Sequence, residues 1–232
     1  MKTYRGNATA VGVLFIACTV SSILSAIPLG STLDVSNLSK LSASGNRVVL
    51  TALIELVWAA TAAGIAIGLY PILRKFNRAL ALGAVAGRVV EGTFVLVGSL
   101  SLLVLLTVSQ ESMAAGVAAP SLFAATGDAW LAAREWLHGF VILLPFLIGA
   151  LMYYYVLYRS RLVPRWLSGW GLAAAVLSLV ATVYSGFTLD FGFTTVNTVL
   201  NAPIGVQEMV LAVWLIVKGF DRSALASLAG GA

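Results

Sequence analysis

VVLTALIELVWAATAAGIAIGLYPILRKFNRALALGAVAGRVVEGTFVLVGSLSLLVLLTV, from Val48 to Val108, holds two long apolar runs joined by a short basic turn. Each run reaches the length of about 20 apolar residues that a helix needs to cross a bilayer. Arg74, Lys75 and Arg78 lie in the turn between the runs. Because a bilayer offers no water to backbone amides, apolar runs of this length are expected to cross it as helices. We therefore expect this stretch to form a transmembrane helical hairpin.

Similar apolar runs occupy the rest of the chain. Of its 232 residues, 60% are hydrophobic and 10% are charged, whereas soluble domains are about 25% charged. So few charged side chains cannot cover a soluble globule of this size. Six runs reach spanning length, at about 8–29, 48–71, 79–108, 134–158, 167–189 and 200–220. The sequence therefore predicts an all-α fold, a polytopic bundle of six transmembrane helices that forms one domain over residues 1–232.

The basic residues predict the orientation of the bundle, because cytoplasmic loops are enriched in Lys and Arg. Basic side chains precede the first run, lie between runs two and three and between runs four and five, and follow run six. They are Lys2, Arg5, Arg74, Lys75, Arg78, Arg159, Arg161, Arg165, Lys218 and Arg222. The loops on the opposite side have fewer basic residues and carry the acids Asp34, Glu111, Asp128 and Asp190. Both termini are therefore expected in the cytoplasm.

The net charge of +5 does not indicate a nucleic-acid partner. Nucleic-acid binding needs basic residues clustered on a solvated surface, whereas here they lie in short loops between spans. Membrane lipids, with anionic headgroups among them, are the expected partners. Cys18 is the single cysteine, which excludes an internal disulfide and a Cys-based metal cluster.

Several polar or ionisable side chains fall inside the predicted spans, where they are costly and usually turn toward the bundle interior. They are Glu55, Arg88, Glu91, Glu135, His138, Gln207 and Glu208. Most lie toward the non-cytoplasmic side, so we expect a polar pocket in the outer half of the bundle. The candidate ligand-binding residues are Glu55, Arg88, Glu91, His138, Gln207 and Glu208.

The partners of these groups differ. Arg88 and Glu91 are three positions apart on one helix face, and the spacing predicts an ion pair. Glu55 and Glu208 have no basic residue in their own spans. Each therefore needs Arg88, a proton, a metal or a hydrogen-bonding partner from another helix.

The Glu-x-x-His spacing of Glu135 and His138 can present a carboxylate and an imidazole to one metal. With Glu55, Glu91 and Glu208 added, these two residues would make a site for divalent iron, manganese or zinc. The expected ligands are Glu91, Glu135, His138 and Glu208. Di-iron bundles carry the motif on two helices, whereas this chain has one His, so a metal-free hydrogen-bonded pocket fits the pattern better. Both alternatives stay open.

Three local features predict departures from plain spanning helices. Residues 109–133 form the longest connection, which we expect to be an outward-facing loop with a short interfacial helix. Pro145 cannot donate a hydrogen bond to the Val141 carbonyl, so a kink or local cavity is expected in the fourth span. The pairs Gly64 with Gly68 and Gly83 with Gly87 predict close helix packing within the bundle.

Four motifs resemble a known family. They are LYPILR at 69–74, RVVE at 88–91, LVPRWLS at 162–168 and EMVLAVWLIVKGF at 208–220. They are similar to a set of six-span bacterial membrane proteins labelled a domain of unknown function, number four-three-eight-six. The resemblance runs from the second span to the C terminus. It implies a multi-pass protein of the bacterial cytoplasmic membrane, and it supplies no activity.

Three functions fit the sequence. The first is a membrane protein whose polar pocket binds a small ligand, a lipid or an ion. The second is an intramembrane enzyme, with or without a metal, acting on a lipid or another apolar substrate. The third is a proton-coupled transporter of a small solute, which is less favoured because no clear inverted repeat is present. The sequence does not identify a catalytic residue or an oligomeric state.

Overall fold

The structure is a computed structural model that describes residues 2–26, 38–115, 120–192 and 194–230. These residues form helices and no strand. The helices are α1 (Lys2–Ala26), α2 (Leu38–Ala43), α3 (Gly45–Leu73), α4 (Arg78–Ala115), α5 (Pro120–Trp136), the π-helical turn η4 (Leu137–Val141), α6 (Leu143–Ser160), α7 (Arg165–Thr188), α8 (Thr195–Val217) and α9 (Arg222–Gly230). In the described part of the chain, six helical segments are long and apolar enough to cross a membrane, counting α5, η4 and α6 as one. The predicted all-α membrane fold with six spans is confirmed.

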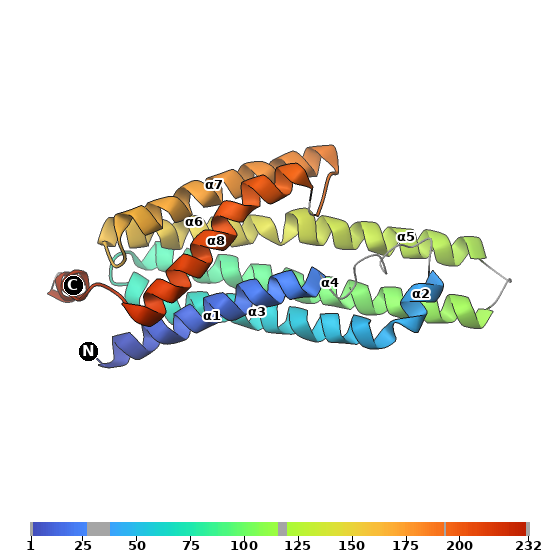
Figure 1. The fold of residues 1–232 in the computed structure, drawn as a ribbon, viewed down its shortest axis with the longest axis horizontal. Helices are drawn as coiled ribbons and strands as arrows, with labels where there is room; N and C mark the ends of the chain where they lie inside the picture. The colour runs from blue at the N-terminus through green and yellow to red at the C-terminus, as the bar shows by residue number, and fades with distance from the viewer. Residues whose placement is uncertain (1, 27–37, 116–119, 193, 231–232) are drawn as a thin grey trace.

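The spanning helices pack in a closed ring in the order α1, α3, α4, α6, α7 and α8, and α8 packs back against α1. Figure 1 shows α3, α4 and the α5–α6 helix running along the long axis of the molecule. Both termini lie at one end, together with the α3–α4 and α6–α7 turns (Figure 1). We refer to this end as the basic end, because the predicted basic segments around Arg5, Lys75, Arg161 and Lys218 all belong to it.

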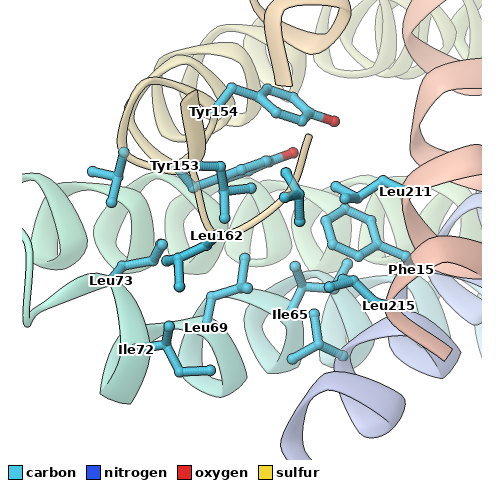
Figure 2. Packing of buried hydrophobic residues seen from close by; sticks show 14 of the residues in the cluster. Phe15, Ile65, Leu69, Ile72, Leu73, Tyr153, Tyr154, Leu162, Leu211 and Leu215 are labelled. Carbon is cyan, nitrogen blue, oxygen red and sulfur yellow. The ribbon is translucent and has the colours of Figure 1, made fainter. Parts of the chain in front are cut away.

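Apolar side chains fill the ring near the basic end. Phe15 of α1, Leu69 of α3, Tyr153 of α6 and Leu211 of α8 are all buried in one cluster. Figure 2 shows these side chains pointing toward one another from their four helices. Arg5 adds polar contacts between α1 and α8 at this end. Its guanidinium donates hydrogen bonds to the carbonyls of Ile216 (2.8 Å) and Val217 (2.9 Å) in the last turn of α8.

The opposite end departs from the predicted boundaries. Helix α4 continues to Ala115, and α5 begins at Pro120. The prediction of a long loop was therefore wrong for residues 109–115 and 120–133, while 116–119 lie outside the described residues. Hydropathy identifies the part of a helix that crosses lipid. It does not show whether the helix continues beyond the lipid. The Ala-rich sequence of α5 favours helix, and α5 packs against α4. The predicted end of the first span, residues 27–29, also lies outside the described residues.

The fourth spanning segment is interrupted where Pro145 predicts an irregularity. The Ile142 N–H donates to the Leu137 carbonyl at 2.9 Å, a bond one residue longer than that of an α-helix. This π-helical turn ends a few residues before Pro145, which cannot continue the regular bonding pattern. The turn carries His138 and lets the segment change pitch between α5 and α6.

The predicted glycine pairs pack inside the bundle. A Cβ atom at Gly64 or Gly68 would meet side chains of α1, and one at Gly83 or Gly87 would meet α6. The prediction of close packing within the bundle is confirmed for both pairs. These contacts hold α3 against α1 and α4 against α6, which brings their polar side chains into the ring.

Candidate functional site

Buried polar side chains gather at two levels of the bundle. The first group, which we name the outer centre, consists of Glu55, Ser99, Arg134 and His138. The second group, the middle centre, contains Arg88, Glu91 and Glu208 with Cys18, Thr19, Trp58 and Tyr153 around them. The sequence predicts one pocket, whereas the structure divides the same acids between two centres.

In the outer centre, Glu55 of α3 is fully buried and both of its carboxylate oxygens have partners. Arg134 of α5 forms an ion pair with Oε1, and the Ser99 hydroxyl of α4 donates to Oε2 at 2.6 Å. Arg134 also donates from Nη1 to the Gly98 carbonyl at 2.7 Å. One carboxylate therefore faces one guanidinium, and the two charges balance.

His138 completes the outer centre from the π-helical turn. Its Nε2 lies 3.5 Å from Glu55 Oε1 and has no hydrogen-bond partner among the described residues. Its ring lies beside the indole of Trp58, with 6.0 Å between centroids. Because Arg134 already neutralises Glu55, the imidazole can stay uncharged here.

The middle centre is built on the predicted ion pair of α4, which is confirmed. Arg88 Nη1 lies 2.9 Å from Glu91 Oε2, and both side chains are buried. The other oxygen of Glu91 accepts a hydrogen bond from Trp58 Nε1 of α3 at 3.3 Å. Trp58 thus contacts both centres, since its ring also packs beside His138.

Glu208 of α8 enters the middle centre without a basic partner of its own. Its two oxygens accept hydrogen bonds from the hydroxyls of Thr19 and Tyr153, each at 3.3 Å. No ion pair joins Glu208 to a basic side chain within the described ranges. Helix α1 connects it to Arg88, because Arg88 Nη2 donates to the sulfur of Cys18, the neighbour of Thr19, at 3.7 Å.

The charges of the middle centre do not balance. Two carboxyl groups, Glu91 and Glu208, share one guanidinium, that of Arg88. The Arg88 guanidinium also lies over the ring of Phe146 at 4.9 Å, and its Nε has no hydrogen-bond partner among the described residues. If both carboxyl groups are ionised, the centre has a net negative charge in the apolar part of the bundle.

Polar groups continue from Glu208 toward α7. The rings of Tyr153 and Tyr154 pack at 4.4 Å, and the Tyr154 hydroxyl donates to Gln207 Oε1. Gln207 Nε2 in turn donates to the carbonyl of Leu167 at 3.0 Å, near the start of α7 at the basic end. The predicted site residue Gln207 therefore lies beside the middle centre and links it to the first turn of α7.

The predicted metal ligands do not come together. Glu135 is exposed, whereas Glu91 and Glu208 lie in the middle centre and His138 lies in the outer centre. In the described part of the chain, no three His, Cys, Asp or Glu side chains are placed to hold one metal ion. The helix turns Arg134 inward and Glu135 outward, so a buried carboxylate next to His138 comes from Glu55 on another helix instead.

Sequence reasoning missed several members of the two centres. Arg134 begins the predicted span at 134–158 and is not among the candidate residues, although it is the basic partner that Glu55 requires. Ser99 and Thr19 resemble the many other hydroxyl residues of the spans, and nothing in the sequence distinguishes them. Tyr153 gives a better signal, because it belongs to a run of three tyrosines inside an apolar span.

Comparison with known proteins gives a family and no activity. No curated protein and no solved structure matches the sequence. The family model described as "Domain of unknown function (DUF4386)" matches residues 10–219. This range covers the six spanning helices except for the first turns of α1, and it includes both buried centres. The chain therefore belongs to the DUF4386 family of membrane proteins, as its motifs predict.

Proposed function

We propose that this membrane protein binds and releases a proton at the middle centre. The observation that carries the proposal is the charge count, with Glu91 and Glu208 against Arg88. An uncompensated charge inside a membrane bundle costs several kcal/mol, so it is usually neutralised by a partner or a proton. Among the expected small ligands, lipids and ions, a proton is the smallest that balances this centre.

The surroundings of Glu208 favour a proton over a metal ion. Among the described residues, the hydrogen-bond partners of its carboxyl group are the hydroxyls of Thr19 and Tyr153, and these groups can donate or accept hydrogen bonds. A metal ion would need several carboxylate, imidazole or thiolate ligands at one point, and the described residues bring no three of them together. We therefore favour a proton over the metal of the metal-dependent alternative.

The outer centre has a structural role in this proposal. Glu55 is already paired with Arg134 and bonded to Ser99, so it needs no proton to stay buried. This difference between the two centres provides an internal comparison. Protonation is expected at Glu208, in the middle centre.

Proton-coupled transport is the second candidate, and the polar side chains beyond Glu208 favour it. Tyr153, Tyr154 and Gln207 extend from the carboxyl group toward the first turn of α7. These polar groups give a polar lining to the region between the buried carboxyl group and the first turn of α7. Transport of a solute would use the protonation of Glu208 as its driving step.

Infrared difference spectroscopy tests the proposal on the full chain in lipid nanodiscs. A step from mildly alkaline to mildly acidic pH is expected to produce the carbonyl band of a protonated carboxyl group in apolar surroundings. Glu208→Gln should remove this band. Glu135→Gln is the matched control, because Glu135 is exposed, and it should leave the band unchanged.

Two outcomes would overturn the proposal. One is a wild-type spectrum without such a band across the neutral range. The other is a band that persists in the single variant Glu91→Gln and also in the single variant Glu208→Gln. Transport is tested separately in proteoliposomes, where solute uptake driven by a pH gradient should fail in Glu208→Gln and persist in Glu135→Gln.

A further inference from the structure

A hollow of about 800 Å³ lies at the basic end, between the turn that joins α6 to α7 and the turn that joins α8 to α9. A hydrogen bond from the Asp221 N–H to the Leu162 carbonyl, at 2.9 Å, ties these two turns together. Leu162, Val163 and Phe220 belong to the lining and are buried. The hollow, which we name the basic hollow, therefore has an apolar floor and walls fixed to the bundle.

Four cationic side chains line the basic hollow. They are Arg161, Arg165, Lys218 and Arg222, and all four are exposed. The ion pairs of the described residues include none of them. Arg165 lies over the ring of Tyr158, with 5.5 Å between its guanidinium carbon and the ring centroid, which orients the group without neutralising it.

The single acid in the lining, Asp221, is already used by the fold. Its carboxylate accepts hydrogen bonds from the Ser223 hydroxyl at 2.5 Å and from the Ala224 N–H at 2.8 Å. These two donors hold the pKa of Asp221 below its usual value of 3.8, so the group stays ionised at neutral pH. Four cations therefore face one carboxylate that caps α9, and the basic hollow keeps an excess of positive charge.

The position of the basic hollow favours a lipid over a soluble anion. Helix α8 supplies Trp214 to the lining, Lys218 follows as its C-terminal cap, and Val213 and Val217 of the same helix are 54% and 59% exposed. Trp166 follows the lining residue Arg165 and is also exposed, as is typical of tryptophan at a membrane interface. The hollow thus lies where the apolar side of the bundle meets its charged end.

We infer that the basic hollow binds the phosphate headgroup of an anionic membrane phospholipid. Guanidinium groups bind phosphate through paired hydrogen bonds, and basic pockets between spanning helices are typical headgroup sites. The acyl chains of such a lipid can lie along Val213 and Val217 while its phosphate faces Arg165 and Lys218. A free phosphate ion would use only the charged half of this arrangement.

Native mass spectrometry of the full chain, released from nanodiscs of mixed phosphatidylglycerol and phosphatidylcholine, tests the inference. The wild type should retain phosphatidylglycerol preferentially. The double variant Arg165→Gln/Arg222→Gln should lose about 100-fold in this preference, because each charge-assisted hydrogen bond to the headgroup phosphate contributes about tenfold. The matched control is Arg74→Gln/Arg159→Gln, which removes two exposed arginines that do not line the hollow.

The control double variant should keep the wild-type preference for phosphatidylglycerol. The double variant Arg165→Lys/Arg222→Lys should retain most of this preference. Circular dichroism shows whether each variant is folded. If the glutamine double variant is unfolded, the lysine double variant is compared with the wild type in its place. Equal loss in both glutamine variants would overturn the inference, since general charge would then explain binding. Displacement of the lipid by millimolar inorganic phosphate would also overturn it, in favour of a soluble anion site.

Discussion

At Glu55, two groups from two other helices satisfy one buried carboxylate, and a third group lies close to it. Arg134 supplies the opposite charge, Ser99 supplies a hydroxyl, and His138 lies at 3.5 Å. Because the carboxylate is fully buried, its ionised form depends on Arg134. The pair therefore joins α3 to the α5–α6 segment by charge as well as by packing.

Arg134→Gln is expected to lower the stability of the bundle by about 3–5 kcal/mol, because it leaves Glu55 as an unpaired buried charge. Adding Glu55→Gln should recover most of this loss, since the buried charge is then absent as well. The unfolding midpoint in a mixed-detergent titration measures both effects. Arg159→Gln is the control, because Arg159 is exposed and forms no ion pair within the described residues.

A double variant no more stable than Arg134→Gln alone would contradict this account of the outer centre. Arg134 would then stabilise the bundle through its bond to the Gly98 carbonyl and not through Glu55. Comparison of the single Glu55→Gln variant with the double variant separates the two contributions.

The sequence predicts that Glu55 needs a partner, but it cannot predict which one. Glu55 and Arg134 are 79 positions apart, and their contact depends on the packing of α3 against its neighbours. Arg88 and Glu91 behave differently, because the helix period alone places them on one face. Local spacing therefore predicts pairs within a helix, whereas pairs between helices follow from the fold.

Among the elements, α4 and α6 pack backbone against backbone at Gly87. A Cβ atom there would lie 2.6 Å from the Pro145 carbonyl oxygen and 2.9 Å from the Gly149 Cα. Both are backbone atoms, so they cannot rotate away as a side chain would. The absence of a side chain at Gly87 is what lets Arg88 and Glu91 sit deep in the ring.

Gly87→Ala should therefore destabilise the protein by about 1–3 kcal/mol, the usual cost of overpacking. Gly205→Ala is the matched control in α8, where an added Cβ meets nothing within 4 Å. The control should be neutral or slightly stabilising, because alanine favours helix more than glycine does. Thermal unfolding of the two variants in the same detergent provides the comparison, and equal midpoints would rule out the close approach.

Asp221 caps α9, and this gives a pH dependence with a defined sign. The Ser223 hydroxyl and the Ala224 N–H lower the pKa of Asp221 below 3.8. The stabilisation of α9 is therefore complete above the usual pKa and is lost as pH falls through the lowered one. Asp221→Ala should speed hydrogen exchange in α9 about fivefold at neutral pH, since a lost N-cap costs about 1 kcal/mol.

Mass spectrometry of exchanged peptides from α9 measures the ratio of the rates in Asp221→Ala and the wild type. The ratio should approach one as the pH falls well below 3.8, because the wild type then loses its cap as well. A ratio that stays constant with pH would show that the carboxylate is not the capping group. Peptides from α7 serve as the internal control and should not respond.

The boundaries of the elements were predictable at the basic end and not at the other. Arg78 and Arg165 begin α4 and α7 where the predicted spans begin, because charge marks the membrane boundary. At the opposite end, α4 runs on to Ala115 through the polar residues 109–112, where the apolar run and the predicted span end, because hydropathy marks the end of the apolar run and not the end of the helix. The interruption of the fourth span was predictable because proline leaves a local signature, whereas the form it takes, a π-helical turn, was not.

Over the whole molecule, helix length shows that the bundle extends beyond the bilayer. Helix α4 has 38 residues, and a helix of that length measures about 57 Å, whereas the hydrocarbon layer is about 30 Å thick. Figure 1 shows the α4–α5 hairpin projecting with α2 at the end opposite the termini. A small cluster of Leu41, Val48, Leu102 and Leu105 packs α2 and α3 against α4 there. This cluster holds α2 and the first turn of α3 on α4 at that end of the bundle.

Labelling with a membrane-impermeant maleimide tests both this projection and the predicted orientation in sealed vesicles of known sidedness. The wild type should remain unlabelled, because Cys18 is buried. Met113→Cys, at a position 56% exposed near the end of α4, should be labelled from the non-cytoplasmic side. Ser223→Cys, at the basic end, should be labelled only from the cytoplasmic side.

Leu96→Cys provides the depth control, since this position is 43% exposed and faces lipid from the middle of α4. It should resist the reagent from both sides, because a thiol in hydrocarbon is not ionised and does not meet an impermeant probe. Labelling of Met113→Cys and Ser223→Cys from the same side would contradict the placement of the basic end and the hairpin on opposite sides of the membrane. Protection of Met113→Cys would instead place the hairpin within the bilayer, and α4 would then have to lie strongly tilted.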